Sequence, residues 1–241
     1  MAVTTVYQSS QGRVGNSASG TLAAAWASAK GTNTTTGNSV GSTSTNDNFG
    51  SRTEAARGGQ FLATNYRAYF YFDLSSISDI TGITFTARGG TNSTNQNGDW
   101  IAARANQDAD FGTIATSDYT LVYNSTTGFT SYSTNQASWS YNADNTVTLN
   151  ATAVTNSNNE GELCVCVMNY FYDYNGGEVE GSIGDIFNSL SFINSGTTRA
   201  RLTVTHTVAS GYDNEVNAII PASISKVLGI ATADISKVTG V

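Results

Sequence analysis

Charged side chains are scarce in this sequence of 241 residues. Only 12% of the residues are Asp, Glu, Lys or Arg, which is about half the share of roughly 25% that is usual for a soluble domain. The net charge is −7, whereas binding to nucleic-acid phosphates needs a basic surface. We therefore expect no nucleic-acid partner. A modest negative charge instead helps to keep a crowded or multimeric protein in solution.

Long apolar runs are also missing. No stretch approaches the ~20 apolar residues of a membrane-spanning helix, so we expect no membrane insertion. The first residues, Met-Ala-Val-Thr-Thr-Val-Tyr, lack the basic and apolar regions of a secretory signal. We expect a complete chain that such a signal does not export, and thiols that stay reduced.

Histidine and cysteine are too few for the common nucleophile–base pairs. His206 is the only histidine, and Cys164 and Cys166 are the only cysteines. At positions i and i+2 of a strand the two thiols point to the same face, with Cα atoms about 6.5–7 Å apart, at the limit for a disulfide. Two ligands alone do not make a structural zinc site. We expect buried, unbridged cysteines, a structural or exposed histidine, no catalytic residues, no metal and no cofactor.

Carboxylates leave two alternatives open. A pair of acids within a few ångströms would allow glycoside hydrolysis. Asn106, Asp108 and Asp110 are spaced like the start of a calcium loop, but Phe111 precedes the glycine and no Glu closes the loop. We interpret that segment as a polar turn. The candidates for a carboxylate pair are Glu54, Asp73, Asp99, Asp108, Asp110, Glu178, Glu180 and Asp185.

Proline is nearly absent, since Pro221 is the only one. A disordered chain carries more proline and charge and fewer aromatic residues, whereas this sequence has 12 Tyr, 10 Phe and 3 Trp. Its polar residues are mostly Ser, Thr, Asn and Gly, which favour turns, strand faces and loops. The composition therefore predicts a folded, β-rich protein.

Two segments have the strongest strand patterns. Residues 66–73 place Tyr66, Ala68, Phe70 and Phe72 on one face and Arg67, Tyr69, Tyr71 and Asp73 on the other. Residues 163–172 are apolar on both faces, which predicts a central strand covered on both sides. Weaker strands are expected at 2–7, 83–88, 100–105, 119–123, 138–141, 146–151, 190–193 and 199–207, where Leu202 and Val204 face inward. Many short strands broken by Asn, Gly and Ser predict an antiparallel sandwich.

Three further segments have less regular patterns. Residues 21–30 fit either one short helix or a buried strand. Residues 31–51 are polar and predict a long loop. Residues 152–161 fit one helical turn before the central strand.

A family resemblance supports the same fold. Tyr66-Arg-Ala-Tyr-Phe-Tyr-Phe-Asp-Leu-Ser-Ser-Ile77 resembles the R-x-Y-hydrophobic-x-F-D-L-S-S-I strand and turn of the DNRLRE-type domain. Residues 80–88, 147–151 and 198–206 resemble later segments of that family, although Ala200 replaces its closing proline. The resemblance covers roughly residues 1–207. It implies a jelly-roll β-sandwich, allied to carbohydrate-binding modules of surface and cell-wall proteins, and carries no ligand site over.

Aromatic side chains are the candidates for binding sugars, because carbohydrate faces pack on aromatic rings. Trp26, Trp100 and Trp139 are the candidate glycan-stacking residues. Tyr170, Tyr172 and Tyr174 alternate in the predicted strand and form a second candidate platform. The alternative is that these large rings fill a sandwich core or a contact between subunits.

The last 20 residues contain a repeat. Residues 222–230 (ASISKVLGI) and 233–241 (ADISKVTGV) align at a spacing of 11 residues. Two short copies cannot bury a core of their own, so we expect this C-terminal arm to pair with another surface, as in strand addition to a sheet edge. A disordered tail is the alternative. The arm residues expected to carry assembly are Ile224, Lys226, Val227, Ile230, Ile235, Lys237, Val238 and Val241.

The I-S-K-V-x-G-V tandem resembles terminal segments of virion proteins from tailed bacteriophages. With the jelly roll, this resemblance implies a non-enzymatic structural protein of a phage virion, which assembles in the host cytoplasm. The implied roles are a decoration, head-fibre or tail-attached subunit. The expected partners are further copies of the chain (a trimer by resemblance), other virion proteins and a host-surface glycan. The alternative function is that of a carbohydrate-binding module. We expect a jelly-roll domain at residues 1–208 and an arm at 209–241.

Overall fold

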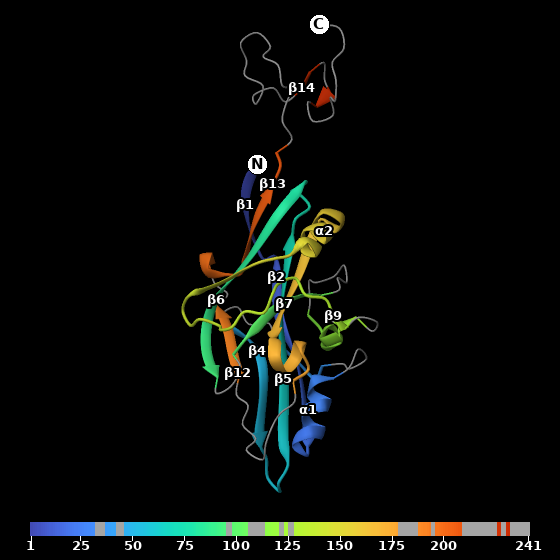
Figure 1. The fold of residues 1–241 in the computed structure, drawn as a ribbon, viewed down its shortest axis with the longest axis vertical. Helices are drawn as coiled ribbons and strands as arrows, with labels where there is room; N and C mark the ends of the chain where they lie inside the picture. The colour runs from blue at the N-terminus through green and yellow to red at the C-terminus, as the bar shows by residue number, and fades with distance from the viewer. Residues whose placement is uncertain are drawn as a thin grey trace.

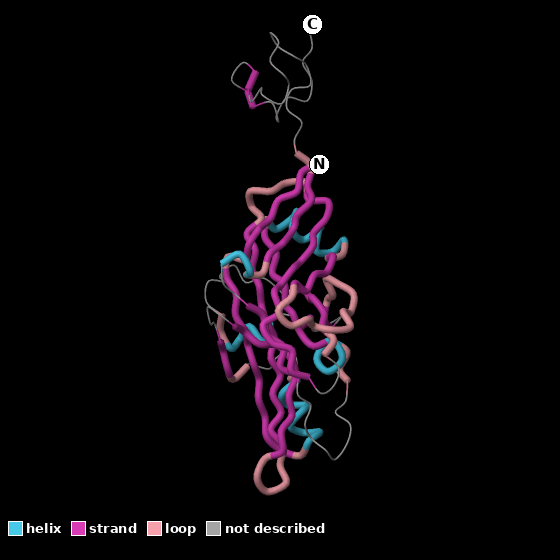
Figure 2. Tube along the Cα trace, turned by 90° about the vertical axis from the view of Figure 1, so that its left-hand side faces the viewer, coloured by secondary structure: helices cyan, strands magenta, loops and turns pink. Residues whose placement is uncertain are grey.

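The computed structural model describes residues 1–31, 37–41, 46–94, 98–105, 114–120, 123–124, 128–177, 188–193, 196–208, 226–227 and 230–231. Antiparallel strands dominate and pack as an elongated sandwich (Figure 1). The few helices lie around the strands (Figure 2). The predicted all-β, jelly-roll-like fold class is confirmed.

The first layer is built around the longest strand, β6 (Ile80–Thr94). The first half of β6 pairs with β13 (Arg201–His206) on one side and with β10 (Asp144–Thr148) on the other. β1 (Ala2–Tyr7) extends this layer beyond β13 and is the last strand of the sheet order. The predicted strand at residues 2–7 is therefore confirmed.

The second layer is built around β5 (Phe61–Asp73). β2 (Ser10–Gly20) lies along one side of β5, with β3 (Ser39–Gly41) beyond it. On its other side β5 pairs with β4 (Asn46–Ala55) and then with β11 (Glu162–Asn169), beyond which lies β7 (Trp100–Arg104). β12 (Asn188–Ile193) pairs with both β6 and β4 and so joins the two layers.

The main core lies between the layers and follows the alternation of β5. Ala68, Phe70 and Phe72 are buried against Phe85 of β6, with ring centroids 5.3 Å apart for Phe70–Phe85. The opposite face of β5 carries Tyr69, which belongs to a second cluster. The predicted division of residues 66–73 into two faces is confirmed, and each fully buried Phe contributes about 1.5–3 kcal/mol.

Strand β11 is central, as its apolar sequence predicts. It lies between β5 and β7. Its odd-numbered residues, such as Val165, belong to the main core, and its even-numbered residues, Cys164, Cys166 and Met168, belong to the second cluster. Both faces are therefore covered.

Two α-helices begin at side-chain caps. α1 (Leu22–Lys30) follows Thr21, whose hydroxyl accepts from the amide of Ala24, and α2 (Ala151–Glu160) follows Asn150, whose side chain accepts from two amides. Gly161 ends α2 in the left-handed conformation, which glycine adopts without strain. The ambiguous segment at residues 21–30 is thus a helix. Among the described residues, no helix is long and apolar enough to cross a membrane.

The prediction of a single long loop at residues 31–51 is wrong, because β3 and residues 46–51 of β4 lie within it. The sequence pattern predicts no strand at β2. β2 and β4 are both rich in Ser, Gly and Asn, and their apolar pattern is weak. Gly15 shows why: a Cβ there would lie 2.4 Å from the ring of Tyr66, so close approach to β5 excludes a larger residue.

Four other strand predictions need correction. Residues 116–120 form the 3-10 helix η1 (Thr116–Thr120), and residues 138–141 form no strand. The segment at 146–151 ends as a strand at Thr148 and enters α2. β11 stops at Asn169, where the side chain caps a single π-helical turn, η2 (Tyr170–Tyr174). The remaining short elements are β8 (Tyr123–Asn124), β9 (Gly128–Phe129) and η3 (Gly196–Thr198).

Two pieces of the C-terminal arm are described. β14 (Lys226–Val227) and β15 (Ile230–Ala231) pair antiparallel in a two-stranded sheet of their own, with Val227 opposite Ile230. The backbone of the first repeat is therefore extended and paired at these residues. The other predicted arm residues, Ile224, Ile235, Lys237, Val238 and Val241, lie outside the described residues.

Candidate functional site

His206 has a structural position. Its Nε2 lies 3.0 Å from Oγ1 of Thr4, so it links β13 to β1 at their shared end. Its Nδ1 lies 3.3 Å from the carbonyl oxygen of Thr207. Within the described part of the chain, no group of three or more His, Cys, Asp or Glu residues could hold a metal ion.

The described candidate carboxylates lie in separate environments. Glu54 of β4 forms an ion pair with Arg52 and lies opposite Leu62 of β5. Asp73 is the last residue of β5, about 36 Å from Leu62 along the strand. A hydrogen bond to Ser75 lowers the pKa of Asp73, and burial raises the pKa of Asp99. A glycosidase needs two carboxyl groups within about 5–9.5 Å, so Glu54 and Asp73 do not form such a pair.

Several acidic candidates lie outside the described residues. They are the calcium-loop segment Asn106, Asp108 and Asp110, together with Glu178, Glu180 and Asp185. Both the calcium interpretation and the remaining carboxylate pairs stay predictions.

Both cysteines are buried and unbridged. Burial raises the pKa of both thiols, with no described cation near Cys164 to oppose it. Each thiol is therefore neutral at ordinary pH and poorly nucleophilic. The prediction that Cys164 and Cys166 act as small core residues is confirmed.

The three tryptophans are buried, which corrects their assignment as glycan-stacking residues. Trp26, Trp100 and Trp139 are only 4%, 1% and 1% exposed. Trp100 and Trp139 pack edge to face in the main core at 5.2 Å, and Trp139 packs in the same way on Phe49. Trp26 of α1 donates its indole N–H to the carbonyl of Gly177. None of the rings presents a face to solvent, and core filling, the open alternative, describes them.

A different aromatic arrangement is partly exposed. Tyr170 and Tyr174 are one turn apart in η2 and stack with ring centroids 5.7 Å apart, at an interplanar angle of 19°. Phe129 stacks on Tyr174 at 5.5 Å. The three rings, which we call the aromatic ladder, are half-buried. Tyr172 points the other way and is buried against Trp26, so the predicted strand platform is corrected to a π-helical ladder.

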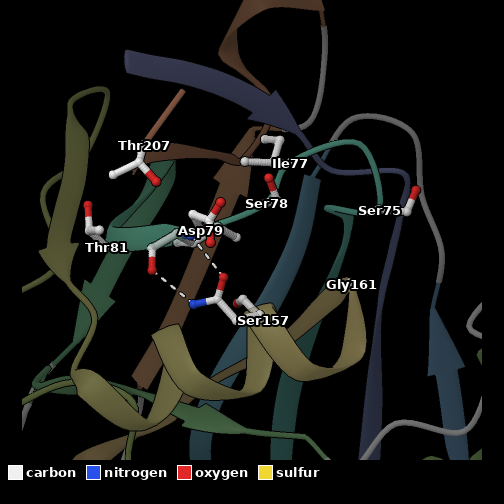
Figure 3. A pocket seen from close by; sticks show the side chains of 10 residues that line it. Ser75, Ile77, Ser78, Asp79, Thr81, Ser157, Gly161 and Thr207 are labelled. Carbon is white, nitrogen blue, oxygen red and sulfur yellow. Dashed lines mark hydrogen bonds between the residues drawn. The ribbon is translucent and has the colours of Figure 1, made fainter. Parts of the chain in front are cut away.

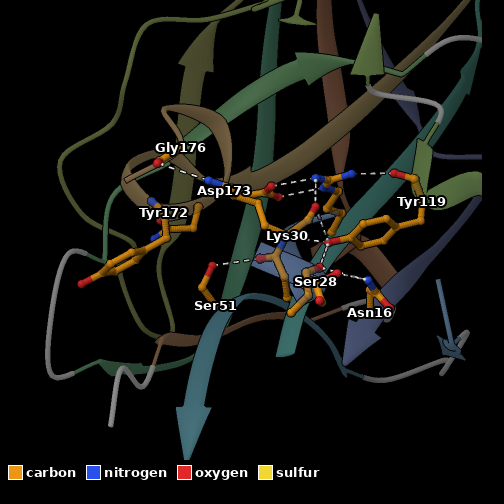
Figure 4. A network of polar contacts seen from close by, with 12 residues as sticks. Asn16, Ser28, Lys30, Ser51, Tyr119, Tyr172, Asp173 and Gly176 are labelled. Atoms are coloured by element: carbon orange, nitrogen blue, oxygen red, sulfur yellow. Dashed lines mark hydrogen bonds and ion pairs between the residues drawn. The ribbon is translucent and has the colours of Figure 1, made fainter. Parts of the chain in front are cut away.

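A buried ion pair fixes the turn that carries this ladder. Nε and Nη2 of Arg67 donate to the two carboxylate oxygens of Asp173 at 2.8 and 2.7 Å, and both side chains are almost fully buried. Nη1 of Arg67 donates to the carbonyl of Tyr119 at 2.6 Å (Figure 4). The guanidinium also lies 4.1 Å from the ring centre of Tyr119 and 5.2 Å from that of Phe129. Asp173 lies between the two ladder tyrosines in sequence, so the pair positions both.

Polar side chains extend this network toward α1. The hydroxyl of Tyr119 donates to the carbonyl of Ala29 at 2.8 Å and accepts from Asn65, which in turn accepts from Ser51. Asn16 donates to the carbonyl of Ser28 at the end of the same helix. Figure 4 shows these groups converging between the second layer, η2 and α1. The site is a satisfied structural network with aromatic rings on its outer side.

A second feature lies where the arm leaves the sandwich. An open hollow of about 650 Å³ is bordered by the turn after β5, the start of β6, α2 and Thr207 (Figure 3). Asn158 of α2 closes its floor by hydrogen bonds to both backbone groups of Ile80, at 2.8 and 2.9 Å. Its rim is formed by the hydroxyl groups of Ser75, Ser78 and Thr81 and by Asp79. These groups offer hydrogen bonds and no nucleophile activated by a described base.

No family model matches the chain, and no curated protein matches it in sequence. The resemblance to the DNRLRE-type domain stays a prediction.

The ion pair yields a test of stability. Asp173→Asn leaves the buried guanidinium of Arg67 without its counter-charge, and loss of one partner of a buried pair costs about 3–5 kcal/mol. The matched control is Glu160→Gln, which breaks the half-exposed pair with Arg104 and should cost less than about 1 kcal/mol. Chemical denaturation measures both free energies of unfolding, and equal losses would refute the role of the pair.

Buried tyrosines predict alkaline unfolding. Burial raises the pKa of Tyr132 to about 12 and raises that of Tyr119 further, above the value near 10 of an unfolded chain. Because the folded-state pKa is raised, this stability is fully present below about pH 10 and is lost as pH rises toward 12. The ionisation of the buried tyrosines, measured by tyrosinate absorbance, should coincide with the loss of the circular dichroism signal of the folded chain. Complete ionisation near pH 10 with the fold intact would contradict the prediction.

Proposed function

We propose that the chain is a non-enzymatic structural protein of a bacteriophage virion. It would serve as a decoration, head-fibre or tail-attached subunit that assembles or is anchored through residues 209–241. Its partners would be further copies of the chain, with three as the expected number, and other virion proteins. Its composition and the terminal repeat support this proposal, as does the paired backbone of β14 and β15 in the arm.

The observation that carries the proposal is that the two ends of the elongated molecule differ in structure. β13 ends at His206, and the arm follows it at one end of the elongated sandwich, while the β4–β5 hairpin lies at the opposite end (Figure 1). The hairpin tip at residues 55–60 is exposed, and Gly58 and Gly59 turn it with positive φ. An arm at one end and an exposed tip at the other suit a subunit that is held at its base and touches a host surface with its tip.

Removal of the arm tests this function. Deleting residues 215–241 should dissolve oligomers and abolish binding to particles while circular dichroism and unfolding of the sandwich stay unchanged, because the buried clusters lie within residues 14–204. Immunogold electron microscopy with antibody to residues 1–208 should label phage particles. Label on heads would indicate a decoration or head fibre, and label on tails would indicate host attachment. Unlabelled particles, with unchanged oligomers after truncation, would refute the proposal.

The aromatic ladder favours a second candidate function, that of a carbohydrate-binding module. Its rings are half-buried and stacked, and the ion pair behind them holds them in place. A sugar face packs on an aromatic ring, and because Tyr174 is stacked on both Phe129 and Tyr170, the end ring Tyr170 is the one on which a sugar would pack. This ladder replaces the buried tryptophans as the surface on which a host glycan would bind.

Substitution of the ladder tests glycan binding. Tyr170→Ala should weaken binding of a glycan identified on an array by about 2- to 13-fold, the effect of losing roughly 0.5–1.5 kcal/mol of ring contact. Tyr141→Ala removes a tyrosine that is 67% exposed elsewhere and should leave the affinity unchanged. Titration calorimetry measures both. Equal affinities for the two variants, with both folded, would exclude the ladder as the site.

A further inference from the structure

We propose that the outer edge of β1 receives the C-terminal arm of a second copy of this chain as an added strand. The inference rests on the proposed assembly function and names the surface that the arm would bind. Strand addition supplies backbone hydrogen bonds along a sheet edge, and side-chain contacts then set the register.

The edge of β1 is regular and open. All six residues of β1 pair with β13 in unbroken register, from Ala2 opposite His206 to Tyr7 opposite Arg201. Among the described residues, no strand pairs with the other side of β1. A strand of this kind presents a row of unpaired amide and carbonyl groups, which is a template for another chain.

β1 lacks the features that protect the edge strands of natural sheets from pairing with other chains. Edge strands are protected by charged residues, by proline, by bulges or by short length. The sequence of β1, Ala-Val-Thr-Thr-Val-Tyr, contains no charge and no proline, and its register shows no bulge.

The other edges in the described structure are treated differently. The outer side of β7 is covered by residues 131–136, which bridge to Trp100 and Ala103. β3 has only three residues. β10 begins with Asp144, which pairs with both Arg88 and Arg201. Compared with these three edges, β1 is longer than β3, has no bridging segment like that on β7 and carries no charge like that on β10.

Side chains at this end of the sandwich suit the arm. Met1, Val3 and Val208 are 95%, 66% and 61% exposed and lie at the shared end of β1 and β13. Asp79 is exposed at the same end, where its carbonyl accepts from the amide of Thr207, and no described ion pair includes it. The arm repeats combine aliphatic residues with Lys226 and Lys237. Apolar and charge complementarity therefore agree.

The arm is long enough for this contact, and its described residues are extended. Residues 209–221, which precede the first repeat, span up to about 43–47 Å when extended. The backbone at Lys226–Val227 is already a strand. In the single chain the described pieces of the arm pair with each other in a separate sheet and leave β1 open. We therefore assign β1 to the arm of a neighbouring copy.

Lysines placed on the edge test the assignment. The double variant Val3→Lys/Thr5→Lys of the full chain places charges at two exposed positions of β1, where they repel the arm lysines and block strand addition. Sedimentation velocity should show complete loss of the oligomer, with the unfolding curve unchanged. Tyr141→Lys adds a charge at an equally exposed position away from β1 and should leave the oligomer intact.

The chain lacking residues 215–241 separates the two proposals. If this truncation dissociates the oligomer but Val3→Lys/Thr5→Lys does not, the β1 assignment is overturned and arm-driven assembly stands. If the truncation leaves the oligomer unchanged, or the full chain is monomeric at every concentration, both are overturned. Dissociation of Tyr141→Lys would show a non-specific charge effect and would also overturn the β1 assignment.

Cross-linking tests the contact directly. Full-length Val3→Cys and Ile235→Cys chains are mixed and treated with a short bismaleimide, to which the buried thiols of Cys164 and Cys166 are inaccessible. The expected product is a dimer that joins one chain of each kind, identified by mass spectrometry of the linked peptides. Absence of that product while the mixed oligomer persists would overturn the assignment.

Discussion

The buried guanidinium of Arg67 is the group on which most of the second layer depends. An unpaired charge at the centre of β5 would cost several kilocalories per mole, so Asp173 has to remain within bidentate reach. This requirement explains why β11 stops at Asn169 and continues as a π-helical turn. The same guanidinium donates to the carbonyl of Tyr119, so η1 is fixed too. One charge thereby sets the course of three segments that are distant in sequence.

The ion pair also determines which aromatic side chains reach the surface. With Asp173 turned inward, Tyr172 is buried against Trp26, and Tyr170 and Tyr174 stack on the outer side. A straight strand would instead place all three tyrosines on one face. The half-buried position of the ladder is therefore a consequence of burying a charge. It has the same geometric origin as the packing of α1, whose Lys30 reaches the carbonyl of Gly176 just after the turn.

The sequence predicts the parts of the fold in which alternation and burial coincide. Residues 66–73 and 199–207 alternate cleanly, and β11 is apolar throughout, so their faces follow from the pattern. β2 does not follow this pattern, because contact with β5 selects a small residue, Gly15, where an apolar one would be expected. The partner of Arg67 lies 106 positions away, and no local pattern indicates it. The sequence alone does not indicate how exposed a tryptophan is, so Trp26, Trp100 and Trp139 fit either glycan stacking or core filling until their burial is known.

The arm and the β1 edge raise one physical question, which is what pairs with a neutral edge strand that has no described partner on its outer side. Natural sheets rarely leave a flat, uncharged edge without protection, because it pairs with any extended chain. Here charge is scarce across the whole sequence, and no described ion pair includes a residue of β1. A chain that carries its own repeat C-terminal to the neighbouring strand β13 can satisfy this edge within an assembly. The open edge and the repeat are then two halves of one interface.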